Sequence, residues 1–230
     1  MPKQKGTMTI VETNRIASSR TPNKFHVEYL NVAQKMAYAC FQQHDVVFLV
    51  GPGGVGKTHL AMAFAINEVL LKNKKKVVLT RPIIEAGESL GFLPGELENK
   101  VHPYMLPLED CLARLVGDAG PQREVIERSI ELCPLAYMRG RTFYNSICIL
   151  DEAQNATEKQ LKMFLTRFGD GTKLIITGDP RQSDLNEETV PLINVVNKLE
   201  TVPGIGIIRF KEDSIVRHPL VAAIINKLEE

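Results

Sequence analysis

Short apolar runs alternate with amphipathic stretches along most of the chain. The clearest runs occupy residues 45–50 ("DVVFLV"), 77–81 ("VVLTR"), 146–150 ("SICIL") and 173–178 ("KLIITG"), and a weaker one occupies 206–210 ("GIIRF"). Each run is continuously apolar and rich in β-branched residues, which is typical of strands buried on both faces of a parallel sheet. The pattern therefore predicts at least four core strands and a weaker fifth.

Helical periodicity lies between these runs and is clearest in "TEKQLKMFLTRFG", residues 157–169. Thr157 and Gln160 have the spacing of a capping box, and Gly169 is placed to end the helix. The apolar face of this helix is expected to comprise Leu161, Phe164, Leu165 and Phe168.

Strands that alternate with helices predict an α/β domain, with a mostly parallel central sheet flanked by helices. Residues 1–22 are expected to form an N-terminal arm, and residues 23–230 a single domain. The chain is expected to close with a helix that begins at Pro219.

Composition narrows the class of protein. The chain has 230 residues, of which 44% are hydrophobic, and its net charge of +1 gives no sign of a nucleic-acid coat protein. A local basic groove is still compatible with that balance. No apolar stretch reaches the roughly 18 residues that span a bilayer, and the polar N-terminus lacks the apolar centre of a signal peptide. The four cysteines lack metal-ligand spacing, so we expect reduced thiols in a cytoplasmic protein with no membrane contact.

A glycine-rich loop follows the first predicted strand. Residues 51–58 read "GPGGVGKT", which fits the phosphate-loop pattern G-x-x-x-x-G-K-[ST]. Glycines let several backbone N–H groups point inward, and the following helix adds its positive N-terminal end. Lys57 would reach the β- and γ-phosphates, and the Thr58 hydroxyl would hold Mg²⁺. The alternative is a glycine-rich turn between strand and helix without a ligand.

The predicted nucleotide-binding residues are those of this loop and the residue after it. They are Gly51, Pro52, Gly53, Gly54, Val55, Gly56, Lys57, Thr58 and His59.

Two acids stand at the end of the third strong run. Asp151 comes directly after "SICIL", where an open sheet places its ligand groups, and its carboxylate can hold Mg²⁺ together with Thr58. Glu152 follows and can orient and polarise an attacking water, which favours hydrolysis over transfer to a small acceptor. The alternative is a pair of acids that cap a helix.

A third strand end reads "TGDPRQSD", residues 177–184. Asp179 and Gln182 are expected at the same edge of the sheet, and the Gln182 amide, which can donate and accept, suits a sensor of the γ-phosphate. By contrast, three irregularly spaced aromatic residues are expected in the core rather than as base-stacking platforms. They are Tyr104, Tyr137 and Phe143.

Together these motifs resemble those of the PhoH family of ATPases, whose core is similar to that of superfamily-one helicases. The resemblance covers roughly residues 25–225. Besides "GPGGVGKTHLA", the matching stretches are "LTRPIIEAGESLGFLPGELENKVHPYMLPL", "LAYMRGRTF", "ILDEAQNAT", "KMFLTRFGDGTKLIITGDPRQSDL" and "DSIVRHPLV". Gly53, Val55 and Arg181 depart from the usual family residues.

The resemblance implies a P-loop NTPase fold with a RecA/helicase-like core, and it adds further roles. Gln34 matches a glutamine that reads the adenine edge, although from the sequence alone a surface glutamine is the simpler reading. Arg217 matches an arginine that could approach the γ-phosphate as a finger, in cis or from a neighbouring subunit. Arg139 and Arg141 are rival fingers.

A second pair of residues has two readings under the same resemblance. Arg81 and Glu85 resemble the helicase segment that contacts or couples to nucleic acid, and a structural salt bridge is an equal alternative.

The function implied is an ATPase that uses ATP and Mg²⁺ and acts on single-stranded RNA as a helicase-like motor. Lys57, Asp151, Glu152, Gln182 and Arg217 would carry catalysis. The alternative is a regulatory ATP-dependent switch without a nucleic-acid substrate. The family also implies a homo-oligomeric ring of six subunits.

Overall fold

The structure is a computed structural model of the chain, and it describes residues 27–83, 97–117, 122–185 and 190–216, with the single positions 220, 221, 224 and 227. The side chains of residues 97–101 are outside that description. The predicted arm, Glu85, Arg217 and most of the closing helix also lie outside it. At the four single positions the backbone is helical, as predicted.

In the described part of the chain, six strands form one sheet in which every pairing is parallel and the order is β3-β2-β4-β5-β1-β6. The strands are β1 Val46–Val50, β2 Lys76–Thr80, β3 Ile130–Leu132, β4 Ser146–Leu150, β5 Lys173–Gly178 and β6 Ile205–Arg209. The five runs read from the sequence are confirmed as strands. The sequence reading missed β3 because it is a three-residue edge strand, only partly buried, that pairs with β2 alone.

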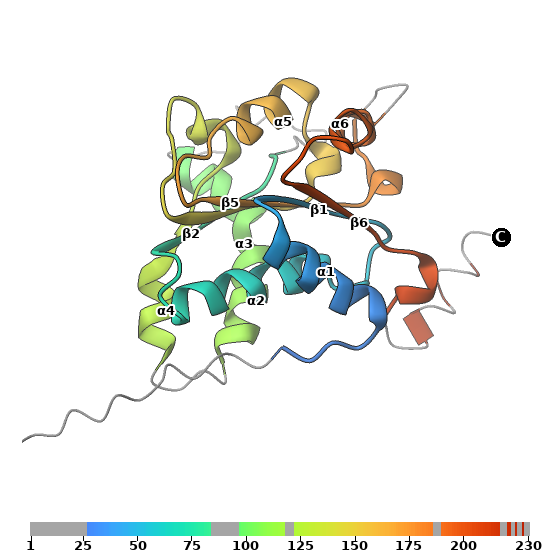
Figure 1. Cartoon of the computed structure of the whole chain (residues 1–230), viewed down its shortest axis with the longest axis horizontal. Coiled ribbons are helices and arrows are strands. Elements are labelled where there is room, and N and C mark those ends of the chain that lie inside the picture. The colour runs from blue at the N-terminus through green and yellow to red at the C-terminus, as the bar shows by residue number, and fades with distance from the viewer. Residues whose placement is uncertain are drawn as a thin grey trace, which may run out of the picture.

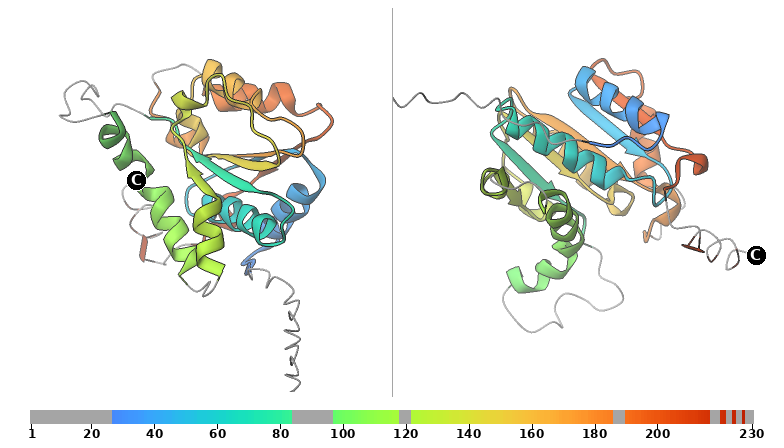
Figure 2. Two further views of the ribbon diagram at one scale, coloured as in Figure 1. Left: turned by 90° about the vertical axis from the view of Figure 1, so that its left-hand side faces the viewer. Right: turned by 90° about the horizontal axis from the view of Figure 1, so that it is seen from below.

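The sheet lies between two layers of helices (Figure 1). One layer holds α1 Val32–Gln43, α2 Lys57–Leu70, α3 Leu97–Val116 and α4 Arg123–Ser129. The other holds α5 Glu158–Leu165 and α6 Pro191–Leu199. The turned views in Figure 2 show the same layering around a twisted sheet, and both α3 and α4 pack against α2. The predicted α/β domain, with a parallel central sheet flanked by helices, is therefore confirmed.

Alternate residues of each strand enter different halves of the core. In β1, Val47 and Leu49 join the cluster beneath α1 and α2, while Val46, Phe48 and Val50 join the cluster beneath α5 and α6. Because both faces are covered, the strands are apolar throughout, which explains their continuous rather than alternating sequence pattern. Within the described residues, no helix is both long and apolar enough to cross a membrane.

Helix α5 begins as predicted but ends earlier. The capping box of Thr157 and Gln160 is present in both directions. The helix stops at Leu165, and the Thr166 hydroxyl donates to the carbonyl of Lys162 at 3.0 Å. The prediction that Gly169 ends the helix is therefore wrong.

The residues after α5 return to the sheet. Phe168 forms an isolated parallel bridge with Phe143, and the Phe168 side chain is 43% exposed, so its expected place on the apolar face is wrong. Phe143 is buried as predicted and Tyr104 is partly buried. Tyr137 is 44% exposed, which contradicts its expected place in the core.

The strand order determines where functional side chains can meet. β5 lies between β4 and β1, so the segments that leave the carboxyl ends of these three strands are neighbours at one edge of the sheet. Those segments are the glycine-rich loop, the acid pair and the 179–182 turn. Open α/β sheets place their ligand sites at this edge.

We predict that Phe164→Ala lowers the free energy of unfolding by about 3–5 kcal/mol, because Phe164 is a fully buried residue of α5. Phe168→Ala is the matched control and should cost less than about 1.5 kcal/mol, because this ring is partly exposed. Urea unfolding of both variants measures the difference. Equal losses would contradict the arrangement of α5 and the segment that follows it.

Candidate nucleotide site

The glycine-rich loop joins β1 to α2 as a strand–turn–helix unit. Gly54 and Gly56 have φ values of 84° and 85°, in the left-handed region that glycine adopts without strain. Gly56 is the N-cap of α2, so the helix begins directly at Lys57. The local fold is the one that a phosphate loop requires, since the N-terminal end of α2 attracts anions.

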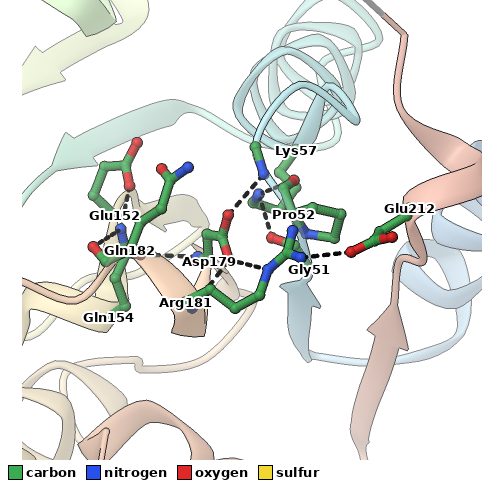
Figure 3. A network of polar contacts seen from close by, with 10 residues as sticks. Gly51, Pro52, Lys57, Glu152, Gln154, Asp179, Arg181, Gln182 and Glu212 are labelled. Atoms are coloured by element: carbon green, nitrogen blue, oxygen red, sulfur yellow. Dashed lines mark hydrogen bonds and ion pairs between the residues drawn. The ribbon is translucent and has the colours of Figure 1, made fainter. Parts of the chain in front are cut away.

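Lys57 folds back over the loop that precedes it. Its Nζ donates to the carbonyl of Gly51 at 2.7 Å and to that of Pro52 at 2.8 Å (Figure 3). These contacts hold the ammonium group beside the loop, and Lys57 also lines the adjacent cavity.

Asp151 is the buried acid of the site, with 3% of its surface exposed. Its Oδ1 accepts hydrogen bonds from the hydroxyls of Thr58 and Thr177, each at 2.6 Å. Asp151 and Thr58 offer hard oxygen ligands side by side, which suits Mg²⁺ that completes its shell with water and phosphate oxygens. Among the residues described, no group of three His, Cys, Asp or Glu side chains is arranged to hold a metal ion.

Glu152 has an unusual backbone, with φ 53° and ψ 42° in the left-handed region. Such a conformation is unfavourable for non-glycine residues and often occurs at functional sites. The side chain lines the cavity, accepts from Gln154 Nε2 at 2.5 Å and lies 3.7 Å from the Arg81 guanidinium. The carboxylate is thus held in place from two sides. The contact with Glu152 places Arg81 beside the acid pair. Glu85, which the sequence paired with Arg81, lies outside the described residues.

Gln154 connects two strand ends and was missed by the sequence reading. It is buried, and its Oε1 accepts from the backbone N–H of Asp179 at 3.0 Å while its Nε2 reaches Glu152 (Figure 3). The available signal was its position three residues after Asp151, in the same loop. Asp179, also buried, accepts from the backbone N–H of Gly53 at 2.7 Å. This chain of contacts ties the acid loop to the phosphate loop.

The site residues surround one cavity of about 450 Å³. From the predicted set, it is lined by Gly53, Gly54, Gly56, Lys57, Thr58, His59, Asp151, Glu152 and Gln182. Arg81, Thr177 and Gly178 complete the sheet side of the cavity. These residues converge, although they come from three different strand ends. Three other members of the predicted nucleotide-binding set do not line the cavity: Gly51, Pro52 and Val55.

Helix α3 supplies a wall that the sequence reading missed. Pro107, Cys111 and Arg114 line the same cavity. The helix carries Pro103 and Pro107 in its interior, where prolines are unfavourable, and these obscure its helical pattern in the sequence.

Two titratable groups of the cavity are shifted. Burial lowers the pKa of His59, and the positive charge of Arg114 lowers it further. Burial raises the pKa of the Cys111 thiol to about 11; the negative charge of Asp151 adds to the rise and Arg114 opposes it. Both groups are therefore favoured in their neutral forms, and Arg114 influences each of them.

Gln34 is 4% exposed, so the simpler reading of a surface glutamine is wrong. Its Oε1 accepts from the Leu30 N–H at 2.8 Å, and its Nε2 donates to the Val55 carbonyl at 3.1 Å. These contacts brace the phosphate loop from behind. The adenine-reading role stays a prediction.

The arginines expected near the γ-phosphate lie elsewhere or outside the described residues. Arg141 pairs with Glu131 at 2.6 Å and covers the Phe143 ring, and neither Arg139 nor Arg141 lines the cavity. Arg217 lies outside the described part of the chain.

Arg181, which departs from the usual family residue, also stays clear of the cavity. It pairs with Glu212 at 2.7 Å and points along the outside of the loop (Figure 3). Arg181 is therefore not part of the cavity lining.

Comparison with known proteins identifies relatives over most of the chain. The sequence profile described as "PhoH-like protein" matches residues 26–229. A "PhoH-like protein" of Bacillus subtilis (strain 168) is 46% identical over 200 residues, which cover 86% of this chain and 63% of that protein. "Protein PhoH" of Escherichia coli (strain K12) is 39% identical over 194 residues, which cover 83% of this chain and 54% of that protein. The resemblance read from the motifs is confirmed, and the chain spans less than two thirds of the length of these relatives.

Among solved structures, the large terminase of a thermophilic bacteriophage is similar in fold. The TM-score is 0.54 at 12% sequence identity, over 87% of this chain and 50% of the terminase. At that identity the likeness supports the fold alone.

We predict that Cys111 reacts slowly with iodoacetamide, because only about 10⁻³ of a thiol with a pKa of about 11 is ionised at pH 8. The rate should be on the order of a hundredfold below that of a free thiol and should rise about tenfold per pH unit, as far as the fold tolerates. Mass spectrometry of the labelled peptide measures it, with Cys111→Ser as the control. A rate equal to that of a free thiol would contradict the enclosed position of Cys111.

Proposed function

We propose that this chain, which belongs to the PhoH-like protein family, binds ATP together with Mg²⁺ and hydrolyses the γ-phosphate. The observation that carries the proposal is the single cavity lined by the phosphate loop, Asp151, Glu152 and Gln182. Phosphoryl transfer depends mainly on positioning and charge stabilisation, and these residues supply the recurring parts of such sites.

In this proposal the phosphate loop carries the triphosphate. Inward N–H groups and the N-terminal end of α2 bind phosphate oxygens, and Lys57 moves from its loop carbonyls to the β- and γ-phosphates. Thr58 and Asp151 would hold Mg²⁺, which would neutralise charge developing on the phosphates. Thr177 keeps the Asp151 carboxylate oriented toward Thr58.

Glu152 is the proposed water-orienting residue. Its carboxylate lines the cavity and is fixed by Gln154 and Arg81, so it is available in a defined position as a general base. Gln182, on a neighbouring strand end, would report the presence of the γ-phosphate through the turn that follows β5. Catalysis by Arg217 stays a prediction from the family resemblance.

Single-stranded RNA is the proposed macromolecular substrate of the ATPase. Exposed aromatic side chains favour it, because bases stack on such rings. Tyr144 is 61% exposed, and Tyr137 and Phe168 are also exposed, in the segments that precede β4 and β5. The balanced net charge of +1 favours the second candidate, an ATP-dependent switch without nucleic acid. The cytoplasmic location and the six-subunit ring stay predictions.

We predict that Glu152→Gln binds ATP with near wild-type affinity and hydrolyses it about 10²–10⁴-fold more slowly, because the amide cannot accept the proton of water. Turnover is measured by phosphate release and affinity by calorimetry. Glu158→Gln is the matched control, since Glu158 lies exposed on α5 and pairs with Lys198. Unimpaired turnover in Glu152→Gln would remove Glu152 from this role.

We predict that single-stranded RNA raises the ATPase rate and that the stimulation falls as salt increases, because phosphate contacts weaken with salt. Tyr144→Ala should reduce the stimulation and leave the basal rate unchanged, since Tyr144 does not line the nucleotide cavity. A basal rate that RNA leaves unchanged at every salt concentration would support the switch instead.

A further inference from the structure

Helix α3 contacts the core and the nucleotide cavity at once. Met105, Leu108 and Leu115 are buried against the core, with 3%, 0% and 2% of their surfaces exposed. The cavity wall is formed by three residues that follow one another at spacings of four and three, so they lie on one face of the helix. They are Pro107, Cys111 and Arg114. The residues that line the cavity therefore belong to a helix that is packed against the core.

Arg114 brings a cation to this wall. Its Nε donates to the Asp110 carbonyl at 3.2 Å, a contact that uses one of the five N–H donors of a guanidinium. The lining of the same cavity also includes His59, at the start of α2, and Cys111, one turn before Arg114 in α3. Arg114 and the start of α2 therefore border the same cavity.

The neighbours of Arg114 indicate which end of a nucleotide it would meet. The cavity is lined by Asp151, Glu152 and Gln182, the groups suited to the metal, the attacking water and the γ-phosphate. Gln34, the predicted adenine reader, is not among the lining residues.

Two other cations line the cavity, and each already has a place in the site. Lys57 belongs to the phosphate loop, and Arg81 lies 3.7 Å from the Glu152 carboxylate. Arg114 is the cation that α3 contributes to the lining of the cavity.

We propose that Arg114 binds the γ-phosphate from within the same chain and thereby makes the site favour a triphosphate over a diphosphate. This inference rests on the proposed function. A guanidinium can donate two parallel hydrogen bonds to phosphate oxygens, and such charge-assisted bonds are stronger than neutral ones. The γ-phosphate would then connect α3 to the phosphate loop, and loss of that phosphate would release α3 from the nucleotide.

The test compares the affinities for a non-hydrolysable Mg·ATP analogue and for Mg·ADP by calorimetry. Arg114→Gln should weaken binding of the triphosphate about tenfold and change ADP affinity less than about twofold, because only the triphosphate offers the charge-assisted bonds. Arg114→Lys, which keeps the charge without the planar fork, should recover part of the loss. Arg128→Gln is the matched control, since Arg128 lies exposed on α4, paired with Glu124, and should change neither affinity.

Two results would overturn the inference while leaving the proposed function in place. One is wild-type triphosphate affinity in Arg114→Gln; the other is an equal loss for ATP analogue and ADP, which would assign Arg114 to the diphosphate part or to the fold. Unfolding midpoints of the two glutamine variants, measured in parallel, show whether an equal loss comes from the fold. If the folded wild-type chain binds neither nucleotide, the proposed function fails together with the inference.

Discussion

The shared hydrogen bonds of the Asp151 carboxylate are the contact on which the site depends. One carboxylate oxygen accepts hydrogen bonds from the hydroxyls of Thr58, at the start of α2, and Thr177, near the end of β5. Asp151 itself follows β4. Three segments distant in sequence are thereby held together at one sheet edge. Because the Asp151 carboxyl group is buried, its hydrogen bonds are needed to offset the loss of water, and removing either hydroxyl would leave it less satisfied.

A second layer of contacts extends this constraint to the surrounding loops. Gln154 links Glu152 to Asp179, Asp179 holds the N–H of Gly53, and Gln34 braces the phosphate loop from behind. Gln154, Asp179 and Gln34 fix the groups that would meet a nucleotide without lining the cavity themselves. Preorganised polar groups of this kind cost little further reorganisation during catalysis. The site is therefore a property of the connected strand ends rather than of the glycine-rich loop alone.

Much of this arrangement could be read from the sequence, because buried parallel strands and phosphate loops have local patterns. β1, β4 and β5 were found from their apolar runs, and the residues after each run predicted the cavity. The predictions that failed concerned contacts between residues distant in the sequence. Phe168 has helical spacing, yet its backbone bridges to Phe143, and the wall of α3 is hidden by two prolines and faces the loop only after folding. The supporting role of Gln154, which follows β4, likewise depends on Asp179, which follows β5.

Calorimetric titration of Mg·ATP into the folded chain, compared with Lys57→Ala, tests the central claim most directly. Wild-type protein should give a saturable heat with one nucleotide per chain, and Lys57→Ala should lose most of that binding because the loop then lacks its cation. Lys159→Ala, an exposed substitution on α5, should bind like the wild type. No heat from folded wild-type protein, or equal affinity in Lys57→Ala, would contradict the account.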